Sequence, residues 1–213
     1  MIIEWKMTKN PITCNPEMSL SDAEKLMKTS HVSQLPVLDK HQKLVGIITQ
    51  KDLLHASPSP ATTLSIHEMA YLLSRLTVSK IMTKKVITIP KSITTEEAAM
   101  MMIDQGLSCL PVMEGDKLIG ILTMTDMFKI LLELFGAREF GIRVSFSVND
   151  KVGAIAQIST ALQEHNIDII TMNTLHNEPG NYIITLKLSG TTKTEVIDIL
   201  KPIVSNIFNV KEV

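Results

Sequence analysis

The sequence predicts a mixed α/β protein in which two copies of a βαββα unit precede a separate βαββαβ domain. An internal repeat in the first part of the chain predicts the two copies. A change to strict alternation of apolar and polar residues after Gly141 predicts the separate domain. With 213 residues, 45% of them hydrophobic, the chain can bury more than one core.

Short motifs recur at a nearly constant spacing in the first part of the chain. Met7-Thr8 recurs as Met82-Thr83, 75 residues later, and Gly46 recurs as Gly120, 74 residues later. The second copy has therefore lost one residue, and Glu114-Gly115-Asp116 reads as the shortened turn. A deletion confined to a turn leaves both flanking strands in register, as two copies of one fold require.

Each copy is predicted to fold as strand, helix, strand, strand and helix. Ser19 with Asp22, and Thr94 with Glu97, have the spacing of residues that cap the start of a helix. Apolar runs of strand length follow each of these helices. The predicted strands are Leu35–Leu38, Lys43–Thr49, Val86–Ile89, Leu110–Met113 and Lys117–Thr123, and the closing helices begin near Lys51 and Thr125.

A hydroxyl and a carboxylate follow the last strand of each copy. Gly46–Asp52 and Gly120–Asp126 both carry the pattern Gly-x-x-Thr-x-x-Asp where an apolar strand meets a helix. The start of a helix offers unpaired N–H groups and a partial positive charge. A threonine there can donate to a phosphate, and a carboxylate one turn later can accept from sugar hydroxyls. The duplicated element predicts a sugar-phosphate site in each copy.

A proline-rich connector separates the two copies. Ala56-Ser57-Pro58-Ser59-Pro60 is stiff and non-helical, whereas residues 66–76 carry apolar side chains at helical spacing. We therefore expect copies at residues 1–55 and 78–136, joined by a linker with a helix at residues 56–77.

Composition and charge argue against several classes of function. Only 4% of the residues are aromatic and the net charge is −1, so the chain lacks the stacking side chains and basic face of a general nucleic-acid-binding protein. No apolar run is long enough to span a bilayer, and the first residues do not resemble a secretory signal. Cys14 and Cys109 form no metal-like cluster and fit a reducing compartment, so we expect a cytoplasmic protein.

Sequence motifs for catalysis are missing. The chain has no Gly-x-Ser-x-Gly elbow and no P-loop lysine motif, and its six histidines lack metal-ligand spacing. The sequence nominates no base that would activate Cys109, whose simplest role is a small buried side chain. We expect no catalytic residue, no metal and no cofactor other than a regulatory ligand.

Together these motifs resemble the CBS family, a regulatory module that binds adenine nucleotides between its two halves. Gly-x-x-Thr-x-x-Asp is the ribose–phosphate signature of that family. A second family element, an apolar residue, two of any kind, an apolar residue and proline, matches Val32–Pro36 and Leu107–Pro111. The resemblance covers roughly residues 1–135.

The resemblance implies a role for each matching residue. Thr49 and Thr123 would touch phosphate, Asp52 and Asp126 would hold ribose hydroxyls, and the remaining residues would line or border the adenine. The nucleotide-binding residues that it implies are Ile12, Thr13, Ser33, Gln34, Leu35, Pro36, Thr49, Asp52, Ile87, Thr88, Ser108, Cys109, Leu110, Pro111, Thr123 and Asp126.

The pattern of the chain changes at residues 140–213. Apolar residues alternate strictly from Ile142 to Val148, which predicts a strand, and a helix ending near Asn166 follows it. Pro202 should kink or end the second helix. The remaining predicted elements are strands at Ile167–Thr174 and Tyr182–Leu188 with a turn at His176–Asn181 between them, a helix at Thr194–Val204 and a strand at Asn209–Val213. The order βαββαβ is the ferredoxin-like arrangement.

This last stretch resembles the ACT family, a small module that often binds amino acids at subunit interfaces. The family loop Asp-x-Pro-Gly matches Asp150-Lys151-Val152-Gly153, with Val152 in place of proline. The glycine would let a ligand approach the helix start closely. The resemblance implies either an amino-acid site at Asp150, Val152 and Gly153 or a module that only dimerises.

A CBS pair followed by an ACT domain resembles the family of acetoin-utilisation proteins, including its connector Ala56-Ser57-Pro58-Ser59. This implies an accessory or regulatory role in the metabolism of acetoin and related carbon stores. We expect a non-catalytic homodimer in which AMP, ADP or ATP shifts the arrangement of the two halves. The apolar stripe formed by Met127, Ile130, Leu131 and Leu134 would serve core or dimer packing. The alternative is an interaction scaffold or regulatory subunit for an enzyme or transporter.

Overall fold

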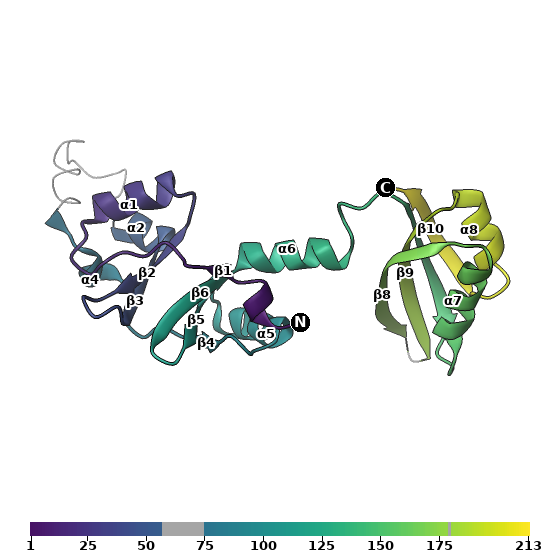
Figure 1. The fold of residues 1–213 in the computed structure, drawn as a ribbon, viewed down its shortest axis with the longest axis horizontal. Helices are drawn as coiled ribbons and strands as arrows, with labels where there is room; N and C mark the ends of the chain where they lie inside the picture. The colour runs from purple at the N-terminus through teal and green to yellow at the C-terminus, as the bar shows by residue number, and fades with distance from the viewer. Residues whose placement is uncertain (57–74, 179) are drawn as a thin grey trace. The chain divides into compact units, whose positions relative to one another are not determined.

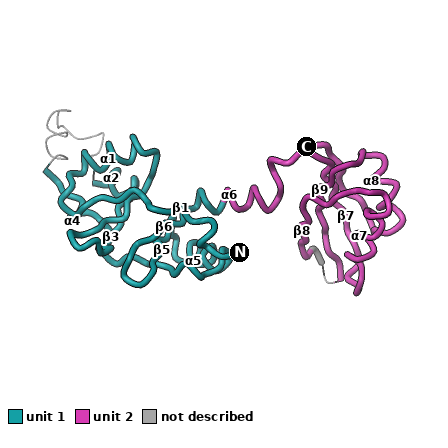
Figure 2. The backbone as a smooth tube through the Cα atoms, viewed as in Figure 1, with its two compact units in different colours: residues 1–127 teal, residues 128–213 magenta. Residues whose placement is uncertain are grey.

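The computed structural model describes residues 1–56, 75–178 and 180–213, without the side chains at positions 177 and 178. The chain divides into two compact units, residues 1–127 (unit 1) and residues 128–213 (unit 2) (Figures 1 and 2). The predicted linker helix, except for its last two residues, and nearly all of the predicted linker lie outside the described residues. None of the described helices is long and apolar enough to cross a membrane.

Unit 1 contains the two copies of the repeat. The first copy comprises η1 (Ile3–Trp5), β1 (Thr8–Lys9), α1 (Leu20–Thr29), β2 (Gln34–Leu38), β3 (Leu44–Thr49) and α2 (Gln50–Ala56). The second comprises α4 (Val78–Ile81), β4 (Ile89–Pro90), α5 (Thr95–Gln105), β5 (Cys109–Glu114), β6 (Lys117–Thr123) and α6 (Met124–Leu134), and α6 continues into unit 2. Side chains of Ser19 and Thr94 accept hydrogen bonds from the N–H groups three residues later, which confirms both predicted helix caps.

The shortened turn of the second copy is confirmed by the strand register. Leu38 pairs with Leu44 in the first copy, whereas Met113 pairs with Leu118 in the second, so the second turn is one residue shorter. Gly115 lies in this turn with a φ of +59°, a conformation that side chains with a Cβ rarely adopt.

The predicted strand at Val86–Ile89 is wrong in its extent. Only Ile89 and Pro90 form a strand, β4, which runs parallel to β5. Upstream, the N–H of Thr83 donates to the carbonyl of Ile47 on β3 at 2.9 Å, and the carbonyl of Thr83 accepts from the Ile47 N–H at 3.0 Å. The segment from Thr83 to Ile89 thus begins beside β3 of one sheet and ends beside β5 of another. The residues between these two ends cross from one sheet to the other and therefore form no strand with either.

The two copies exchange their first segments, which the sequence pattern did not predict. β1 of the first copy pairs with β6 of the second, and Thr83 of the second copy pairs with Ile47 of the first. A Cβ added to Gly120 would lie 2.5 Å from the sulfur of Met7, and one added to Gly46 would lie 2.4 Å from that of Met82. The glycine of each signature therefore makes room for the methionine of the exchanged segment.

Each copy has its own hydrophobic core between its helices and its sheet. The first core includes Leu20, Leu35 and Ile48, and the second includes Ala98, Leu110 and Leu122. The three methionines of the run Met100-Met101-Met102 on α5 differ in burial. Met102 is buried, but Met100 is 57% exposed because it lies on the outer face of α5.

Unit 2 is a four-stranded antiparallel sheet with α7 and α8 on one face (Figure 1). Its elements are β7 (Ile142–Asn149), α7 (Ala154–Glu164), β8 (Asp168–Glu178), β9 (Asn181–Ser189), α8 (Lys193–Leu200) and β10 (Asn206–Glu212). The strands lie in the order β10-β7-β9-β8. The core between helices and sheet includes Phe146, Leu162, Leu186 and Leu200.

Three predicted boundaries in unit 2 are wrong. The turn between β8 and β9 is shorter than His176–Asn181, because His176 pairs with Tyr182 and extends the ladder. Helix α8 ends at Leu200 rather than Val204, because Pro202, which was expected to kink or end the helix, has no N–H to continue the hydrogen-bond ladder. β10 begins at residue 206 rather than 209.

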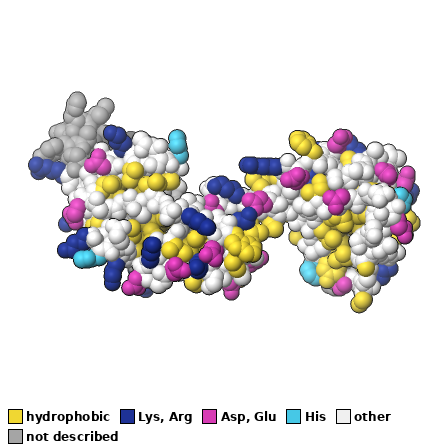
Figure 3. All heavy atoms as spheres, in the orientation of Figure 1, with side chains coloured by type: hydrophobic (Ala, Val, Ile, Leu, Met, Phe, Trp, Pro, Cys, Tyr) yellow, Lys and Arg dark blue, Asp and Glu magenta, His cyan; other side chains and the backbone are white. Residues whose placement is uncertain are grey.

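Charged side chains of both signs are interspersed on the visible face of each unit (Figure 3). One cation of unit 2, Lys187, is only 5% exposed. Its ammonium donates a hydrogen bond of 2.8 Å to the carbonyl of Gly136, just beyond the end of α6. A cation is favourable there because the last carbonyls of a helix carry partial negative charge.

Candidate functional site

The threonine and aspartate of each signature form the same closed hydrogen-bonded pair. The N–H and hydroxyl of Thr49 donate to Asp52 Oδ2, at 2.8 and 2.7 Å, and the Asp52 N–H donates to Thr49 Oγ1 at 3.3 Å. The corresponding distances for Thr123 and Asp126 are 3.0, 2.8 and 3.2 Å. Two copies of one geometry place a carboxylate at the start of α2 and of α6.

The backbone donors at these helix starts are largely satisfied. The Gln50 N–H donates to the carbonyl of Ser33 at 2.8 Å, and the Met124 N–H donates to the carbonyl of Ser108 at 3.0 Å. The expectation of unpaired N–H groups at these positions is therefore wrong. The aspartate side chain folds back over the first turn and takes the place of an external anion.

The remaining predicted nucleotide-binding residues differ in their exposure. Leu35 and Leu110 are fully buried in the two cores, so only their backbones are open to a ligand. Pro36 and Pro111 are also buried, whereas Ser33, Ser108, Ile12 and Thr88 are exposed, and Thr13 and Ile87 are partly buried. The residues just before β2 and β5, rather than the apolar centres of these strands, are therefore the exposed ones.

Cys109 marks the place where the two copies meet. The pKa of its thiol is raised to about 11, chiefly by burial; hydrogen bonds with Ser108 and Gln34 lower this pKa, and the charge of Asp52 adds to the rise. Gln34 and Asp52 of the first copy therefore lie beside Cys109 of the second. Buried Ile47 and Ile121 complete this contact, which we call the seam, and Val86 packs against it.

The pKa of Cys109 predicts slow alkylation. At pH 8 a pKa of about 11 rather than 9.0 lowers the thiolate fraction, and hence the rate, by about 100-fold. Burial gives Cys14 the same pKa of about 11. Peptide mapping after iodoacetamide treatment should show both residues unmodified in the folded protein and modified in urea. Alkylation of folded Cys109 at the rate seen in urea would contradict this burial.

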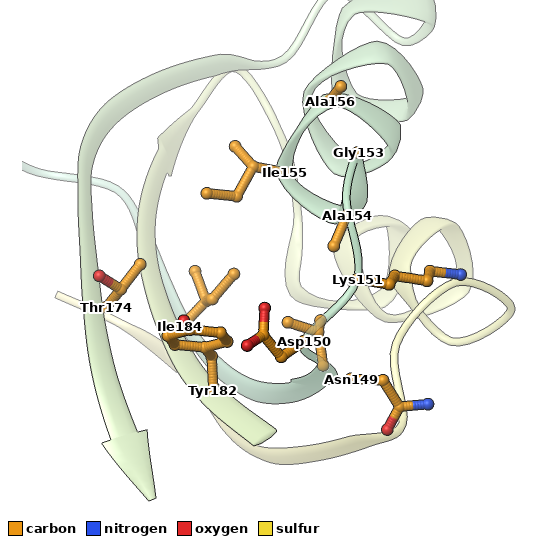
Figure 4. Close-up of a pocket in the computed structure, with 11 residues that line it drawn as sticks. Asn149, Asp150, Lys151, Gly153, Ala154, Ile155, Ala156, Thr174, Tyr182 and Ile184 are labelled. Carbon is orange, nitrogen blue, oxygen red and sulfur yellow. The ribbon is translucent and has the colours of Figure 1, made fainter. Parts of the chain in front are cut away.

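A second candidate site lies in unit 2, in a hollow of about 420 Å³ beside the start of α7. Ile155, Ile184 and the carboxylate of Asp150 point toward it from different elements, with Tyr182 at its border (Figure 4). Gly153 has a φ of +88° at the first turn of α7, which explains the glycine in the loop.

Two of the three residues predicted for a ligand in this domain, Asp150 and Gly153, line the hollow. The third, Val152, is fully exposed and is not among the lining residues. Ile155, which the sequence did not single out for this site, lies at the edge of the hollow and is 48% exposed. Within the described ranges, no group of three or more His, Cys, Asp or Glu side chains is placed to hold a metal ion.

Comparison with protein families identifies the architecture of unit 1. The CBS domain model matches residues 2–59 and 78–133, which together exceed half of the chain. The chain therefore belongs to the CBS domain family and contains a CBS domain pair.

Solved CBS structures resemble this pair. A Vibrio cholerae protein that carries the provisional name acetoin utilization protein (AcuB) shares 29% identity at a TM-score of 0.54, over 65% of this chain and 95% of its own. The CBS domain pair of protein MJ0100, in complex with 5′-methylthioadenosine and S-adenosyl-L-methionine, shares 27% at 0.52, over 65% and 98%. CBSX2 in complex with AMP shares 29% at 0.51, over 63% and 98%. Homologous CBS pairs thus bind adenosine compounds.

Curated relatives include much longer proteins. Inosine-5′-monophosphate dehydrogenase of Bifidobacterium longum is 30% identical over 179 residues, which cover 82% of this chain and 30% of that enzyme. The enzyme of Aquifex aeolicus is 28% identical over 188 residues, which cover 86% and 36%. The chain spans about a third of the length of these relatives.

Proposed function

We propose that the CBS pair binds adenine nucleotides, AMP, ADP or ATP, in clefts to which both copies of the repeat contribute. The observation that carries this proposal is the duplicated threonine–aspartate pair, which has the same three hydrogen bonds in each copy. The proximity of Asp52 to Cys109 supports clefts built from both copies. The AMP complex of a CBS pair with 29% identity supports the ligand class.

The observed hydrogen bonds suggest a division of labour within each pair. In our proposal the carboxylates of Asp52 and Asp126 accept hydrogen bonds from ribose hydroxyls. The hydroxyl protons of Thr49 and Thr123 are directed at these carboxylates, so the threonines hold them in position. Direct contact of either threonine with phosphate would require its hydroxyl to change partner.

The role that we propose is regulatory and non-catalytic. A nucleotide that contacts both copies binds most tightly in one mutual arrangement of the copies, and so shifts the population toward that arrangement. The similarity to a protein named for acetoin utilization supports a place in acetoin or carbon-store metabolism. The free thiols of Cys14 and Cys109 support a reducing, cytoplasmic location.

Isothermal titration with AMP tests the site. Asp52→Asn and Asp126→Asn keep the size of the side chain but remove the charge that accepts from ribose. Loss of a charge-assisted hydrogen bond costs about 1.5–3 kcal/mol, so each variant should weaken its own cleft by roughly 10- to 150-fold. Asp104→Asn, an exposed aspartate on α5, is the matched control. Unchanged affinity in the double variant would remove Asp52 and Asp126 from the site.

For unit 2 we propose an ACT domain of ferredoxin-like fold. The element order βαββαβ and the antiparallel sheet support this assignment. The hollow beside Gly153 favours a small ligand such as an amino acid, because apolar walls surround one directed carboxylate. Without such a ligand, the module would act in dimerisation alone.

A second candidate function is an interaction scaffold for a second copy of the chain, an enzyme or a transporter. Helix α6 favours it, because several of its large apolar side chains are about half exposed. They are Phe128, Leu131, Leu132 and Leu134. Analytical ultracentrifugation of the wild type and of Leu131→Lys distinguishes the cases. A homodimer should dissociate in the variant, and an unchanged sedimentation coefficient would contradict a role of this face in dimerisation.

A further inference from the structure

Helix α6 begins in unit 1, at one of the two proposed nucleotide clefts, and ends in unit 2 (Figure 2). Asp126 lies in its first turn, where its carboxylate accepts from Thr123 and is almost fully buried. The equivalent helix of the first copy, α2, carries Asp52 and belongs to unit 1 as far as it is described. Of these two helices, α6 alone therefore extends from one unit into the other.

The end of α6 is fixed by a complete set of capping hydrogen bonds. The Gly136 N–H donates to the carbonyl of Glu133 at 2.9 Å, and the Ala137 N–H donates to that of Leu132 at 2.8 Å. These two bonds make a Schellman motif, in which the residue after the helix is left-handed. Gly136 has the required φ of +55°. A Cβ there would lie 2.9 Å from the side chain of Thr171, so this turn packs directly on β8.

Lys187 ties this capping turn to the sheet of unit 2. Its side chain on β9 is only 5% exposed, and its ammonium donates to the carbonyl of Gly136 at 2.8 Å. That partner carries no full charge, and the residue opposite on β7, Arg143, is another cation. A buried charge with so little compensation is costly, and an apolar side chain of similar length would be cheaper there. What the lysine holds, the end of α6, explains it better than the stability of the sheet does.

The start of α6 depends on its end because a helix forms cooperatively. An isolated helix of 11 residues is marginal in water, since each added hydrogen bond relies on the turn before it. Phe128, Leu131 and Leu134 are about half exposed, so apolar packing supports the second half of α6 only in part. Fraying from an end that is not held would therefore reach the first turn, which positions Asp126.

We propose that Lys187 is a positioning residue for the Asp126 cleft and acts on it through α6. This role rests on the proposed function and adds the route by which that site communicates with unit 2. By holding the end of the helix, Lys187 keeps the first turn formed and the carboxylate of Asp126 in place. Because coupling is reciprocal, a nucleotide at Asp126 in turn strengthens the attachment of α6 to unit 2. The cleft of Asp52 lacks this route.

Hydrogen exchange of the full chain with and without AMP tests the coupling on the native lysine. The variant Asp52→Asn keeps the Asp126 cleft, so AMP should slow the exchange of residues 128–137 by about fivefold. The variant Asp126→Asn keeps the other cleft, and bound AMP should leave these residues unchanged. Unchanged exchange of residues 128–137 in Asp52→Asn with AMP bound would overturn the coupling.

Calorimetry on Lys187→Met in the same two backgrounds measures the reverse effect. AMP affinity should fall about fivefold where Asp126 is the remaining carboxylate, and should stay within about twofold where Asp52 is. Lys187→Arg retains a donor for the Gly136 carbonyl and should recover most of the loss. Lys211→Met, which removes an exposed lysine from β10, is the control of equal charge.

The outcomes separate this inference from the proposed function. An equal loss at both clefts in Lys187→Met would overturn the route through α6, and an equal loss in the Lys211 control would assign the effect to net charge. If Lys187→Met unfolds unit 2, the exchange experiment on the native lysine decides the question. AMP binding without coupling would leave the proposed function intact, whereas a wild type that binds no AMP would overturn both.

Discussion

Phe146→Ala is expected to destabilise unit 2 by about 3–5 kcal/mol and to leave unit 1 intact. The side chain of Phe146 on β7 is completely buried, and all residues of its core cluster belong to unit 2. Small domains are stable by only about 5–15 kcal/mol, so this loss should expose much of the unit to exchange. Hydrogen exchange followed by mass spectrometry should show loss of protection in β7, β8 and β9.

The control for this prediction is Phe140→Ala. It removes the same atoms from the same unit, but Phe140 is 89% exposed, so its protection pattern should match the wild type. Peptides from residues 1–127 should keep their protection in both variants. An equal loss of protection in both units of the Phe146 variant would contradict separate cores for the two units.

Met7→Ala is expected to destabilise unit 1 by about 2–5 kcal/mol. Met7 is nearly buried, and although it belongs to the first copy, it packs in the core of the second with Leu122. Its loss leaves a cavity where the exchanged segment crosses Gly120. Urea unfolding should show the lower stability, and Met100→Ala on the exposed face of α5 should change it by less than about 0.5 kcal/mol.

The contact between Met7 and Gly120 can be isolated by a double-mutant cycle. Gly120→Ala alone should cost about 1–3 kcal/mol, because its Cβ would meet the Met7 sulfur at 2.5 Å and the Thr8 carbonyl oxygen at 3.1 Å. In the Met7→Ala background the sulfur is absent, and the cost should fall by about 1 kcal/mol or more. Strict additivity of the two changes would contradict the packing of the exchanged segment on Gly120.

The sequence predicted those parts of the fold that depend on a regular pattern of residues within a single helix or strand. The alternation from Ile142 to Val148 predicted β7, and the spacing of Thr94 and Glu97 predicted the start of α5, because local hydrogen bonds and one-sided burial decide both. The constant offset between Gly46 and Gly120 predicted the duplication. Pairing between distant segments leaves no such local pattern.

The exchange of first segments depends on that kind of distant pairing. Thr8 and Thr83 lie in extended segments that are too short to show an alternation of apolar and polar residues. Each of them pairs with a strand of the other copy, Thr8 with Ile121 and Thr83 with Ile47. Only the joint recurrence of methionine and glycine, Met7 with Gly120 and Met82 with Gly46, carried a signal.

At the candidate site the sequence predicted which chemical groups are present, but not the hydrogen bonds that they form with each other. The types and spacing of Thr49 and Asp52 were apparent from the chain, whereas their mutual hydrogen bonds depend on the backbone turn at the start of α2. The full exposure of the apolar side chain of Val152 likewise could not be predicted from a pattern in the sequence.

Native mass spectrometry with AMP tests the central claim, that each threonine–aspartate pair serves one nucleotide cleft. The wild-type chain should bind two AMP molecules per protomer, and Asp52→Asn and Asp126→Asn should each bind one at the same AMP concentration. Combining the two substitutions should abolish binding. Two bound AMP molecules in the double variant, or none in the wild type, would contradict the account.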